Sequence, residues 1–244
     1  MGIFSLVVAR KGSKGLANKV VQLVNGKYVF EYSIEYSLNL EKVINATIFT
    51  VVSSDSELIE TYCLSKGIHF IKREDRLSSD TCRIEEVIYD AYTNVGKNFK
   101  YISLLYGNVP TRYPDEFLKA YNFLEENNDY DAVLSMQNVG KYNPSWIFEY
   151  NEEILPLKKK EGYRRQDLKQ FMIHDGHTIL FRSDYFINFI KNGKKDEFMY
   201  QTFGRKIKPL INNKLIIDVD TKSEFILTAY VLNVIGEFIP DNNG

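Results

Sequence analysis

Cysteine is scarce in this sequence, with Cys63 and Cys82 the only two among 244 residues. Two thiols are too few for a disulfide framework or a thiolate metal site, so we expect both to be packing residues in a reducing compartment. Charge of one sign is also lacking, because 31 basic residues balance 32 acidic ones. A general nucleic-acid or membrane-surface binder is therefore excluded, and any basic site has to be local.

Long hydrophobic runs are absent too. No apolar stretch approaches the roughly 20 residues that cross a bilayer, and the N-terminus shows no basic region followed by a long apolar segment. We therefore expect a cytoplasmic protein that has no membrane partner and binds no nucleic acid. A chain of 244 residues fits one large α/β domain, or one domain with a modest appendage.

The first nineteen residues contain the strongest local signal. An apolar run, Ile3–Ala9, leads directly into the glycine- and lysine-rich stretch Arg10–Lys19. We interpret this as a buried strand followed by a phosphate-binding loop, in which Gly12 and Gly15 allow positive φ angles and the cationic side chains attract a nucleoside triphosphate. A plain solvated turn is the alternative. The spacing matches neither a Walker loop nor the dinucleotide-binding motif.

Apolar and helical patterns alternate along the rest of the chain. This alternation predicts a Rossmann-like α/β fold, with a mostly parallel sheet covered by helices on both faces. Residues 140–170 differ in composition and read as an excursion inserted between body segments 1–139 and 171–244. The expected strands are 3–9, 46–53, 68–71, 101–105, 132–137, 172–182 and 215–220. The expected helices are 28–40, 84–95, 114–126 and 222–238, besides one that ends at 65 and a polar one between 182 and the turn around Gly193.

Two acidic residues near the C-terminus predict a cation site. Asp218 and Asp220 alternate on the last expected strand, so their carboxylates project from one face. An oxygen-only site with few protein ligands suits Mg²⁺, which substrate phosphates commonly complete. The alternative is that one aspartate caps the following helix while the other is solvated. Thr221 and Glu224 have the spacing of a capping box for that helix.

Further polar residues could serve the same crevice, because ligands in open α/β sheets bind beyond the carboxyl ends of the strands. The loop 106–112 follows one such strand. Arg164 and Arg165 precede Gln166 and have the chemistry to bind an anionic substrate in bidentate fashion, although a surface ion-pair role is equally compatible. Among the histidines, His69 in an apolar strand is expected in the core.

Several segments resemble one family in order along nearly the whole chain. Residues 9–16 read Ala-Arg-Lys-Gly-Ser-Lys-Gly-Leu, which is similar to the motif Ala-Arg-Gly-Gly-Ser-Lys-Gly-Ile/Leu. That motif belongs to the cytidylyltransferases that make CMP-activated acidic sugars. This is the family of the CMP-sialic acid synthetases, to which the CMP-Kdo synthetases are related. The other matching segments are Lys19, Gly26-Lys27, Ser53–Ser56, Arg73, Leu77–Thr81, Pro144–Trp146, Arg164–Asp167, Asp175-Gly176 and Ile217–Asp220.

The resemblance implies a nucleotide-diphospho-sugar transferase type of fold. It also implies transfer of CMP from CTP to the anomeric hydroxyl of an acidic sugar, release of pyrophosphate, and a homodimer formed through the excursion. By this resemblance Mg²⁺ is held by Asp218 and Asp220, and the catalytic cations are Arg10, Lys14 and Lys19. The nucleotide-binding residues it implies are Ala9, Arg10, Gly12, Ser13, Lys14, Gly15, Lys19, Ser54, Asp55, Arg73, Ser79 and Asp80. The substrate-binding residues are Tyr106, Asn108, Arg112, Arg164, Arg165, Gln166 and Asp175.

Departures from the family pattern cluster in the loop 106–112. The family motif there is Gln-Pro-Thr-Ser-Pro-Leu-Arg, whereas this chain reads Tyr-Gly-Asn-Val-Pro-Thr-Arg. Val20 replaces a family asparagine, and Lys11 replaces a glycine. These differences bear on the identity of the acceptor and on the choice of base. A sugar phosphate acceptor or another nucleotide, a glycosyltransferase with an Asp-x-Asp site, and a silent nucleotide-binding scaffold therefore remain alternatives.

Overall fold

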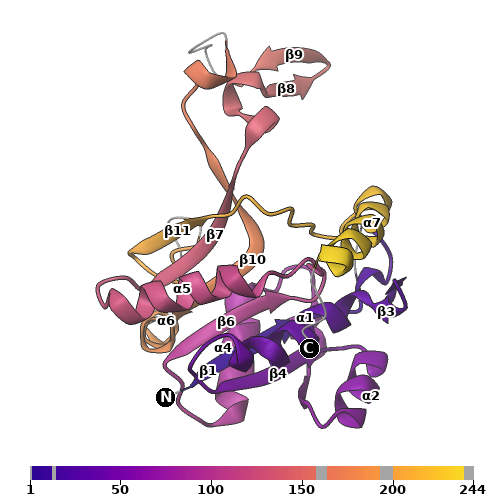
Figure 1. Cartoon of the computed structure of the whole chain (residues 1–244), viewed down its shortest axis with the longest axis vertical. Coiled ribbons are helices and arrows are strands. Elements are labelled where there is room, and N and C mark those ends of the chain that lie inside the picture. Colours follow the sequence, from indigo (N-terminus) through magenta and orange to yellow (C-terminus); the bar gives the residue numbers. More distant parts are fainter. Residues whose placement is uncertain (1, 13–14, 158–163, 193–199, 239–244) are drawn as a thin grey trace.

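The computed structural model describes residues 2–12, 15–157, 164–192 and 200–238. Its centre is a seven-stranded sheet with the order β11-β7-β10-β6-β1-β4-β5 (Figure 1). The strands are β1 (Ile3–Val8), β4 (Ile48–Ser54), β5 (His69–Lys72), β6 (Tyr101–Tyr106), β7 (Ala132–Asn138), β10 (Met172–Arg182) and β11 (Ile207–Ile211). Only β10 runs antiparallel to its neighbours within this sheet, while the other pairings are parallel. The expected mostly parallel sheet is confirmed.

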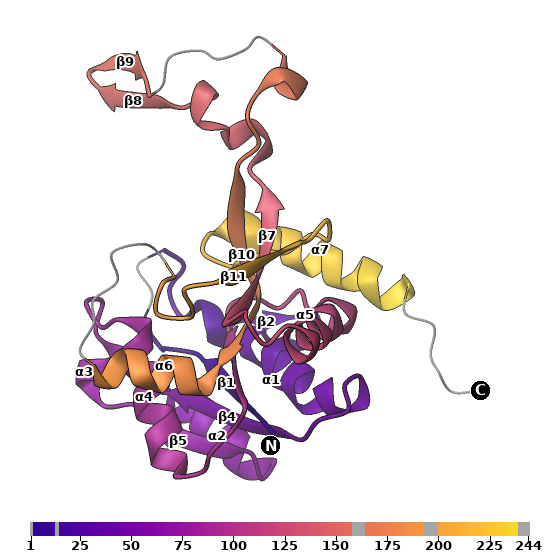
Figure 2. The same cartoon turned by 90° about the vertical axis from the view of Figure 1, so that its left-hand side faces the viewer.

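Helices cover both faces of the sheet, as Figures 1 and 2 show. Side chains of α1 (Val29–Asn39), α2 (Glu57–Ser65) and α5 (Pro114–Glu126) pack into one core cluster. Those of α4 (Ile84–Val95) and α6 (Ser183–Lys191) pack into another. β1 contributes alternate residues to the two clusters, and all of its side chains are buried. Burial on both faces explains why this strand is a continuous apolar run.

The helix boundaries follow local signals in the sequence. α5 begins with Pro114 at its first turn, where the missing N–H has no cost. The last helix, α7 (Lys222–Phe238), has the expected capping box, because the N–H of Glu224 donates to Thr221 Oγ1 at 3.3 Å and the N–H of Thr221 donates to Glu224 Oε2 at 2.8 Å. One further short helix, α3 (Asp75–Ser78), lies between β5 and α4.

Residues 215–220 form no strand, so the expected last strand is wrong. Their backbone bonds to the loop after β6 instead of to the sheet: the N–H of Val219 donates to Asn108 O and that of Ile217 to Thr111 Oγ1, both at 2.9 Å. The strand that completes the sheet on that side is β11, which the sequence did not predict. We refer to residues 215–220 as the acidic segment.

His69 is exposed and not in the core, which is a second correction. β5 lies at the edge of the sheet, so its side chains are only partly covered. The His69 ring lies 5.6 Å from that of Phe49, measured between centroids.

The excursion stands apart from the body of the molecule (Figures 1 and 2). β7 and β10 lead into it, and it carries the small hairpin of β8 (Phe148–Asn151) and β9 (Glu153–Pro156). A second small hairpin joins β2 (Leu23–Val24) to β3 (Lys27–Tyr28), and α7 packs against it in the body. None of the helices in the described ranges combines the length and apolarity that a membrane span requires.

Candidate nucleotide-binding site

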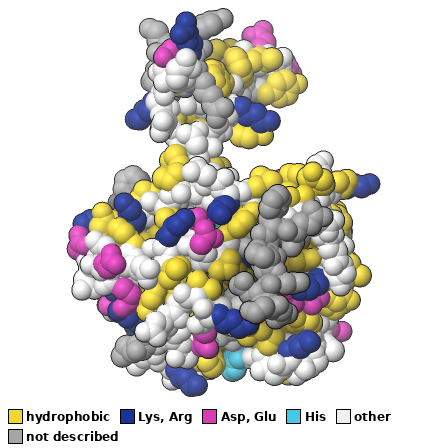
Figure 3. All heavy atoms as spheres, viewed as in Figure 1, with side chains coloured by type: hydrophobic (Ala, Val, Ile, Leu, Met, Phe, Trp, Pro, Cys, Tyr) yellow, Lys and Arg dark blue, Asp and Glu magenta, His cyan; other side chains and the backbone are white. Residues whose placement is uncertain are grey.

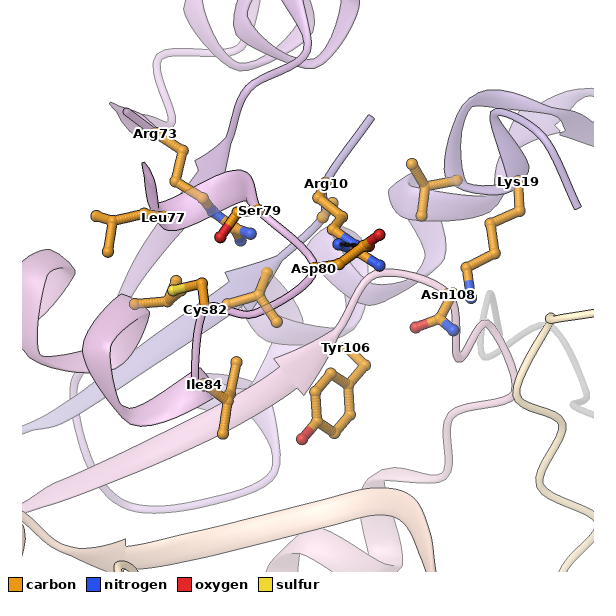
Figure 4. A pocket seen from close by; sticks show the side chains of 14 residues that line it. Arg10, Lys19, Arg73, Leu77, Ser79, Asp80, Cys82, Ile84, Tyr106 and Asn108 are labelled. Carbon is orange, nitrogen blue, oxygen red and sulfur yellow. Dashed lines mark hydrogen bonds and ion pairs between the residues drawn. The ribbon is translucent and has the colours of Figure 1, made fainter. Parts of the chain in front are cut away.

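A pocket of about 260 Å³ opens where β1 and β6 end (Figure 4). Residues from distant parts of the chain meet there, as expected for the carboxyl ends of parallel strands. Eight of the predicted site residues line it: Ala9, Arg10, Lys19, Arg73, Ser79, Asp80, Tyr106 and Asn108. The remaining lining residues are Val8, Val20, Leu77, Cys82, Ile84 and Val87.

Cationic side chains occupy one side of this pocket. Arg10 Nη1 lies 2.8 Å from Asp80 Oδ1, an ion pair that joins the first loop to the segment after α3. Arg73 is only 7% exposed, and its guanidinium donates to Ser53 Oγ at 3.1 Å and to Ser53 O at 2.9 Å. Burial lowers the pKa of Arg73. Arginine nevertheless stays protonated in proteins, so the pocket holds a buried positive charge.

Other predicted nucleotide-binding residues shape the first loop without lining the pocket. The N–H of Lys11 donates to Asp55 Oδ1 at 2.6 Å. Ser54 is buried, and its Oγ accepts from the N–H of Ser56 at 3.1 Å. Gly12 has no positive φ, and a Cβ there would meet nothing within 4 Å, so the expected need for glycine is not seen at this position. Ser13 and Lys14 lie outside the described residues.

The loop and the acidic segment meet directly. Lys19 Nζ forms an ion pair with Asp220 Oδ1 although 201 positions separate the two residues. A Cβ on Gly15 would lie 2.5 Å from Asp220 O, so only glycine allows this approach of the two backbones. The predicted meeting of a basic loop and an acidic pair at one crevice therefore occurs through Gly15 and Lys19.

Asp218 and Asp220 lie on the open side of the acidic segment, because the alternate residues Ile217 and Val219 are buried. Partial burial and the neighbouring charge of Asp220 raise the pKa of Asp218 to about 6. Asn108 Nδ2 donates to Asp218 Oδ1. The two carboxylates repel each other, and a divalent cation bound between them would offset that repulsion. Mg²⁺ is such a cation, and it needs few protein ligands. Among the described residues there is no cluster of three or more His, Cys, Asp or Glu able to hold a metal.

Arg112 lies beneath this site and not in it. Its guanidinium donates to Tyr106 O at 2.8 Å and to His177 O at 2.6 Å, and it lies 5.6 Å from the centre of the Tyr36 ring. Burial lowers the pKa of Arg112 to about 10. The side chain holds the end of β6 in place, and nearly all of its donors are used within the protein.

Asp175 is likewise engaged by the protein. Its Oδ1 accepts from Ser135 Oγ and from the N–H of His177 at 3.0 Å, and its Oδ2 accepts from Asn212 Nδ2 at 3.0 Å. His177 is buried, and its Nε2 accepts from the N–H of Tyr113 at 2.8 Å, which leaves the ring proton on Nδ1. Neither His177 nor Asp175 lines the pocket.

The predicted residues of the excursion are not brought to the pocket of their own chain. Arg164 is exposed, and Gln166 lines a separate small hollow with Asn143 and Leu168. The side chain of Arg165 lies outside the described part of the structure. Figures 1 and 2 show the excursion far from the carboxyl ends of β1 and β6.

Two residues of the loop after β6 were missed as site residues. Gly107 packs so closely on β1 that a Cβ would lie 2.8 Å from Ala9 Cβ and 3.2 Å from Val8 O. Thr111 is completely buried and accepts the backbone hydrogen bond from Ile217. Their departure from the family motif was the one available signal. The apolar lining residues, such as Cys82 and Ile84, carry no chemical signature in the sequence.

Comparison with known proteins gives one clear family match. The profile of the family described as Cytidylyltransferase matches residues 4–228. An N-acylneuraminate cytidylyltransferase of Streptococcus agalactiae serotype V is 27% identical over 224 residues, which cover 91% of this chain and 51% of the relative. The chain thus spans about half the length of the streptococcal relatives that it matches.

Other relatives match along nearly their whole length. The CMP-N,N'-diacetyllegionaminic acid synthase of Legionella pneumophila is 25% identical, with 96% of this chain and 97% of the relative covered. Among solved structures, a CMP:2-keto-3-deoxy-manno-octonic acid synthetase complexed with CTP superposes with a TM-score of 0.70 at 14% identity, covering 96% of this chain and 100% of that one. This structural likeness supports the same fold.

Proposed function

Because the chain belongs to the cytidylyltransferase family, we propose that it transfers CMP from CTP to the anomeric hydroxyl of an acidic sugar of the sialic-acid type, releasing pyrophosphate in a Mg²⁺-dependent reaction. The relatives named for N-acylneuraminate and for diacetyllegionaminic acid support this substrate class.

The Lys19–Asp220 ion pair is the observation that carries the proposal. It brings the basic loop after β1 and the acidic pair onto one opening, next to the pocket lined by Arg10 and Arg73. A triphosphate placed there meets cations on one side and carboxylates on the other. The carboxylates favour a phosphate group only when a cation lies between the two.

The residues divide the chemistry as follows. Asp218 and Asp220 would hold Mg²⁺, which when bound supplies positive charge to the phosphate oxygens. Arg10 and Lys19 offset the negative charge that builds on the α-phosphate and on the departing pyrophosphate. The sugar hydroxyl oxygen forms the new bond to the α-phosphorus, the bond to the β-phosphate oxygen breaks, and the hydroxyl proton is released. No covalent link to the protein is needed.

Tyr106 and Asn108 form the side of the pocket next to the acidic segment, where the acceptor would lie. Burial raises the pKa of Tyr106, so its hydroxyl remains a neutral hydrogen-bond donor. An aromatic ring at this position favours an acceptor that presents a flat, apolar face.

Pyrophosphate release measured against a panel of nucleotides and acceptors tests the proposal. CTP with a sialic-acid-like sugar should give the highest rate. If GTP with a hexose phosphate outpaced CTP with every sugar acid, the proposed substrates would be wrong while the nucleotidyltransferase fold remained. No pyrophosphate release with any pair would favour a silent nucleotide-binding protein.

A further inference from the structure

The acidic segment is held in place without strand pairing. Two of its buried residues direct their N–H groups to the loop after β6: Ile217 to Thr111 Oγ1 and Val219 to Asn108 O, each at 2.9 Å. At the start of the segment, the hydroxyl of Tyr113 donates to Leu215 O at 3.3 Å. Thr111 is the only one of these partners that accepts with a side chain, and its exposed fraction is 0%.

The far end of the segment has separate support. The N–H of Asp220 donates to Glu224 Oε2 at 2.9 Å, at the beginning of α7. Asp218 lies between the two supports, next to Ile217. Its backbone is fixed on one side by the hydrogen bond that Thr111 accepts from Ile217 and on the other by the one that Asn108 O accepts from Val219, while Asn108 Nδ2 donates to the carboxylate itself.

The loop that carries Thr111 is itself rigidly anchored. Ser33 Oγ lies 2.9 Å from Tyr106 O and 3.1 Å from Val109 O, and Arg112 donates to Tyr106 O at 2.8 Å. Gly107 N also donates to Val8 O at 2.9 Å, which ties the loop to β1. The loop is thus a firm support on which the acidic segment rests.

We propose that Thr111 is a positioning residue for the acidic pair, acting through the backbone of Ile217 to set the separation and orientation of the Asp218 and Asp220 carboxylates. The inference rests on the proposed function, in which this pair binds a divalent cation together with the triphosphate. Mg²⁺ demands near-ideal octahedral geometry, so a small displacement of one carboxylate weakens binding. Thr111 itself does not line the pocket and contacts no reacting group.

Thr111→Val is the direct test, because valine keeps the shape and removes the acceptor, leaving the N–H of Ile217 without its partner. Mn²⁺ binding is followed by electron paramagnetic resonance of the free ion, with the full chain and equimolar CTP, and the Mn²⁺ that the same CTP binds without protein is subtracted. We expect the Mn²⁺ dissociation constant to rise about tenfold, as the loss of one buried hydrogen bond implies. Thr111→Ser retains the hydroxyl and should stay within about twofold of the wild type.

Two further variants separate positioning from general stability. Ser37→Ala removes another buried hydroxyl. Ser37 lies on α1, away from the pocket, and its Oγ donates to Ser5 Oγ at 2.6 Å. It should lower the melting temperature and leave Mn²⁺ affinity unchanged. Thr111→Ala removes the same hydroxyl as Thr111→Val and serves in its place if valine disturbs folding.

The outcomes are distinguishable from those of the proposed function. If the wild type binds Mn²⁺ and releases pyrophosphate but Thr111→Val binds the ion equally well, or Ser37→Ala weakens binding as much, the positioning role is refuted and the proposed function stands. A wild type that binds no Mn²⁺ with CTP refutes both. Weakened binding in Thr111→Val alone, restored in Thr111→Ser, supports the inference.

Discussion

The central strands of the body and the hairpin of the excursion differ in how far their apolar side chains are exposed to solvent. Every residue of β1 is buried in the body, whereas Tyr150 is 82% exposed and Ile154 68% exposed in the excursion. Figure 3 shows hydrophobic side chains on the surface of the excursion, at the top of the view. Exposed apolar side chains gathered on one small element mark an interaction surface. The body exposes some apolar side chains too, such as Tyr230 at 69%, but its central strands are buried, whereas both strands of the hairpin in the excursion expose theirs.

The predicted site residues are likewise divided between the body and the excursion. The body supplies the pocket, with Arg10, Lys19 and the acidic pair, while the excursion carries Arg164 away from it. We propose that a second copy of the chain covers the excursion, and that Arg164 reaches the active site of that copy.

Asp220→Asn tests the body and should have the largest effect. Loss of a cation ligand should reduce pyrophosphate release at least about 100-fold, because the metal supplies several kcal/mol of transition-state stabilisation. The fold and the oligomeric state should not change, as circular dichroism and light scattering would show. Asp129→Asn is the matched control, since Asp129 pairs with Lys206 away from the pocket. Unchanged activity in Asp220→Asn would show that Asp220 is not a ligand of a metal ion that the reaction needs.

Tyr150→Asp combined with Ile154→Asp tests the excursion. The two residues are directly paired across β8 and β9 and so share one face of the hairpin. Two charges there should convert a dimer to a monomer, measured by size-exclusion chromatography with light scattering. Leu155→Asp, on the opposite face of the same hairpin, is the control. If the wild-type chain is monomeric, the proposal that a second copy covers the excursion is wrong.

Arg164→Ala tests whether the excursion of one copy contributes to the active site in the body of the other. We expect the KM for the sugar acid to rise about tenfold, the size expected for a lost charge-assisted hydrogen bond. The KM for CTP should stay the same. Mixing this variant with Asp220→Asn should restore roughly one quarter of wild-type activity, because random pairing of a symmetric dimer gives half heterodimers with one working site each. Absence of restoration would place Arg164 outside the partner's site.

Acidification gives the smallest effect and should act on the body alone, because residues 140–170 contain no histidine. Burial, with a smaller contribution from the charge of Arg112, holds the pKa of His177 well below the usual 6.5. At His177 the unfolded chain therefore binds more protons than the folded one below pH 6.5. The contribution of His177 to the free energy of unfolding should fall by up to about 1.4 kcal/mol for each pH unit below that value. Asp218, whose pKa is raised to about 6 in the folded chain, acts in the opposite direction as the pH falls through that value.

Denaturant titrations between pH 5 and pH 7 would measure this fall. His177→Gln should reduce the dependence on pH, and the part that remains should include His174, whose pKa burial also lowers. His69→Gln serves as the control, since His69 is exposed. An equally steep fall in His177→Gln would assign the effect to other groups.

The sequence could predict the elements whose signals are local. Continuous apolar runs marked β1 and β6, and Thr221 with Glu224 marked the start of α7. β11 was missed because Lys208 and Pro209 make it read as a loop. A proline is tolerated there because β11 is an edge strand.

The site was predictable to a similar degree. The basic loop after the first strand pointed to Arg10 and Lys19, and the Asp-x-Asp spacing pointed to Asp220, although the strand expected to carry it does not form. The role of Thr111 could not be seen, because it depends on a backbone contact 106 positions along the chain. Likewise, residues 215–220 have the alternation of a strand, but only the packing of distant segments determines whether a strand partner exists.

Gly107 limits how the substrate range of this protein can evolve. A Cβ at this position would lie 2.8 Å from Ala9 Cβ, so a larger residue there, such as the proline of the family motif, requires the loop and β1 to lie farther apart. Positions 106 and 108 line the pocket on either side of Gly107 and can vary without that shift. A library confined to those two codons would therefore change the lining of the cleft while leaving the course of β1 intact.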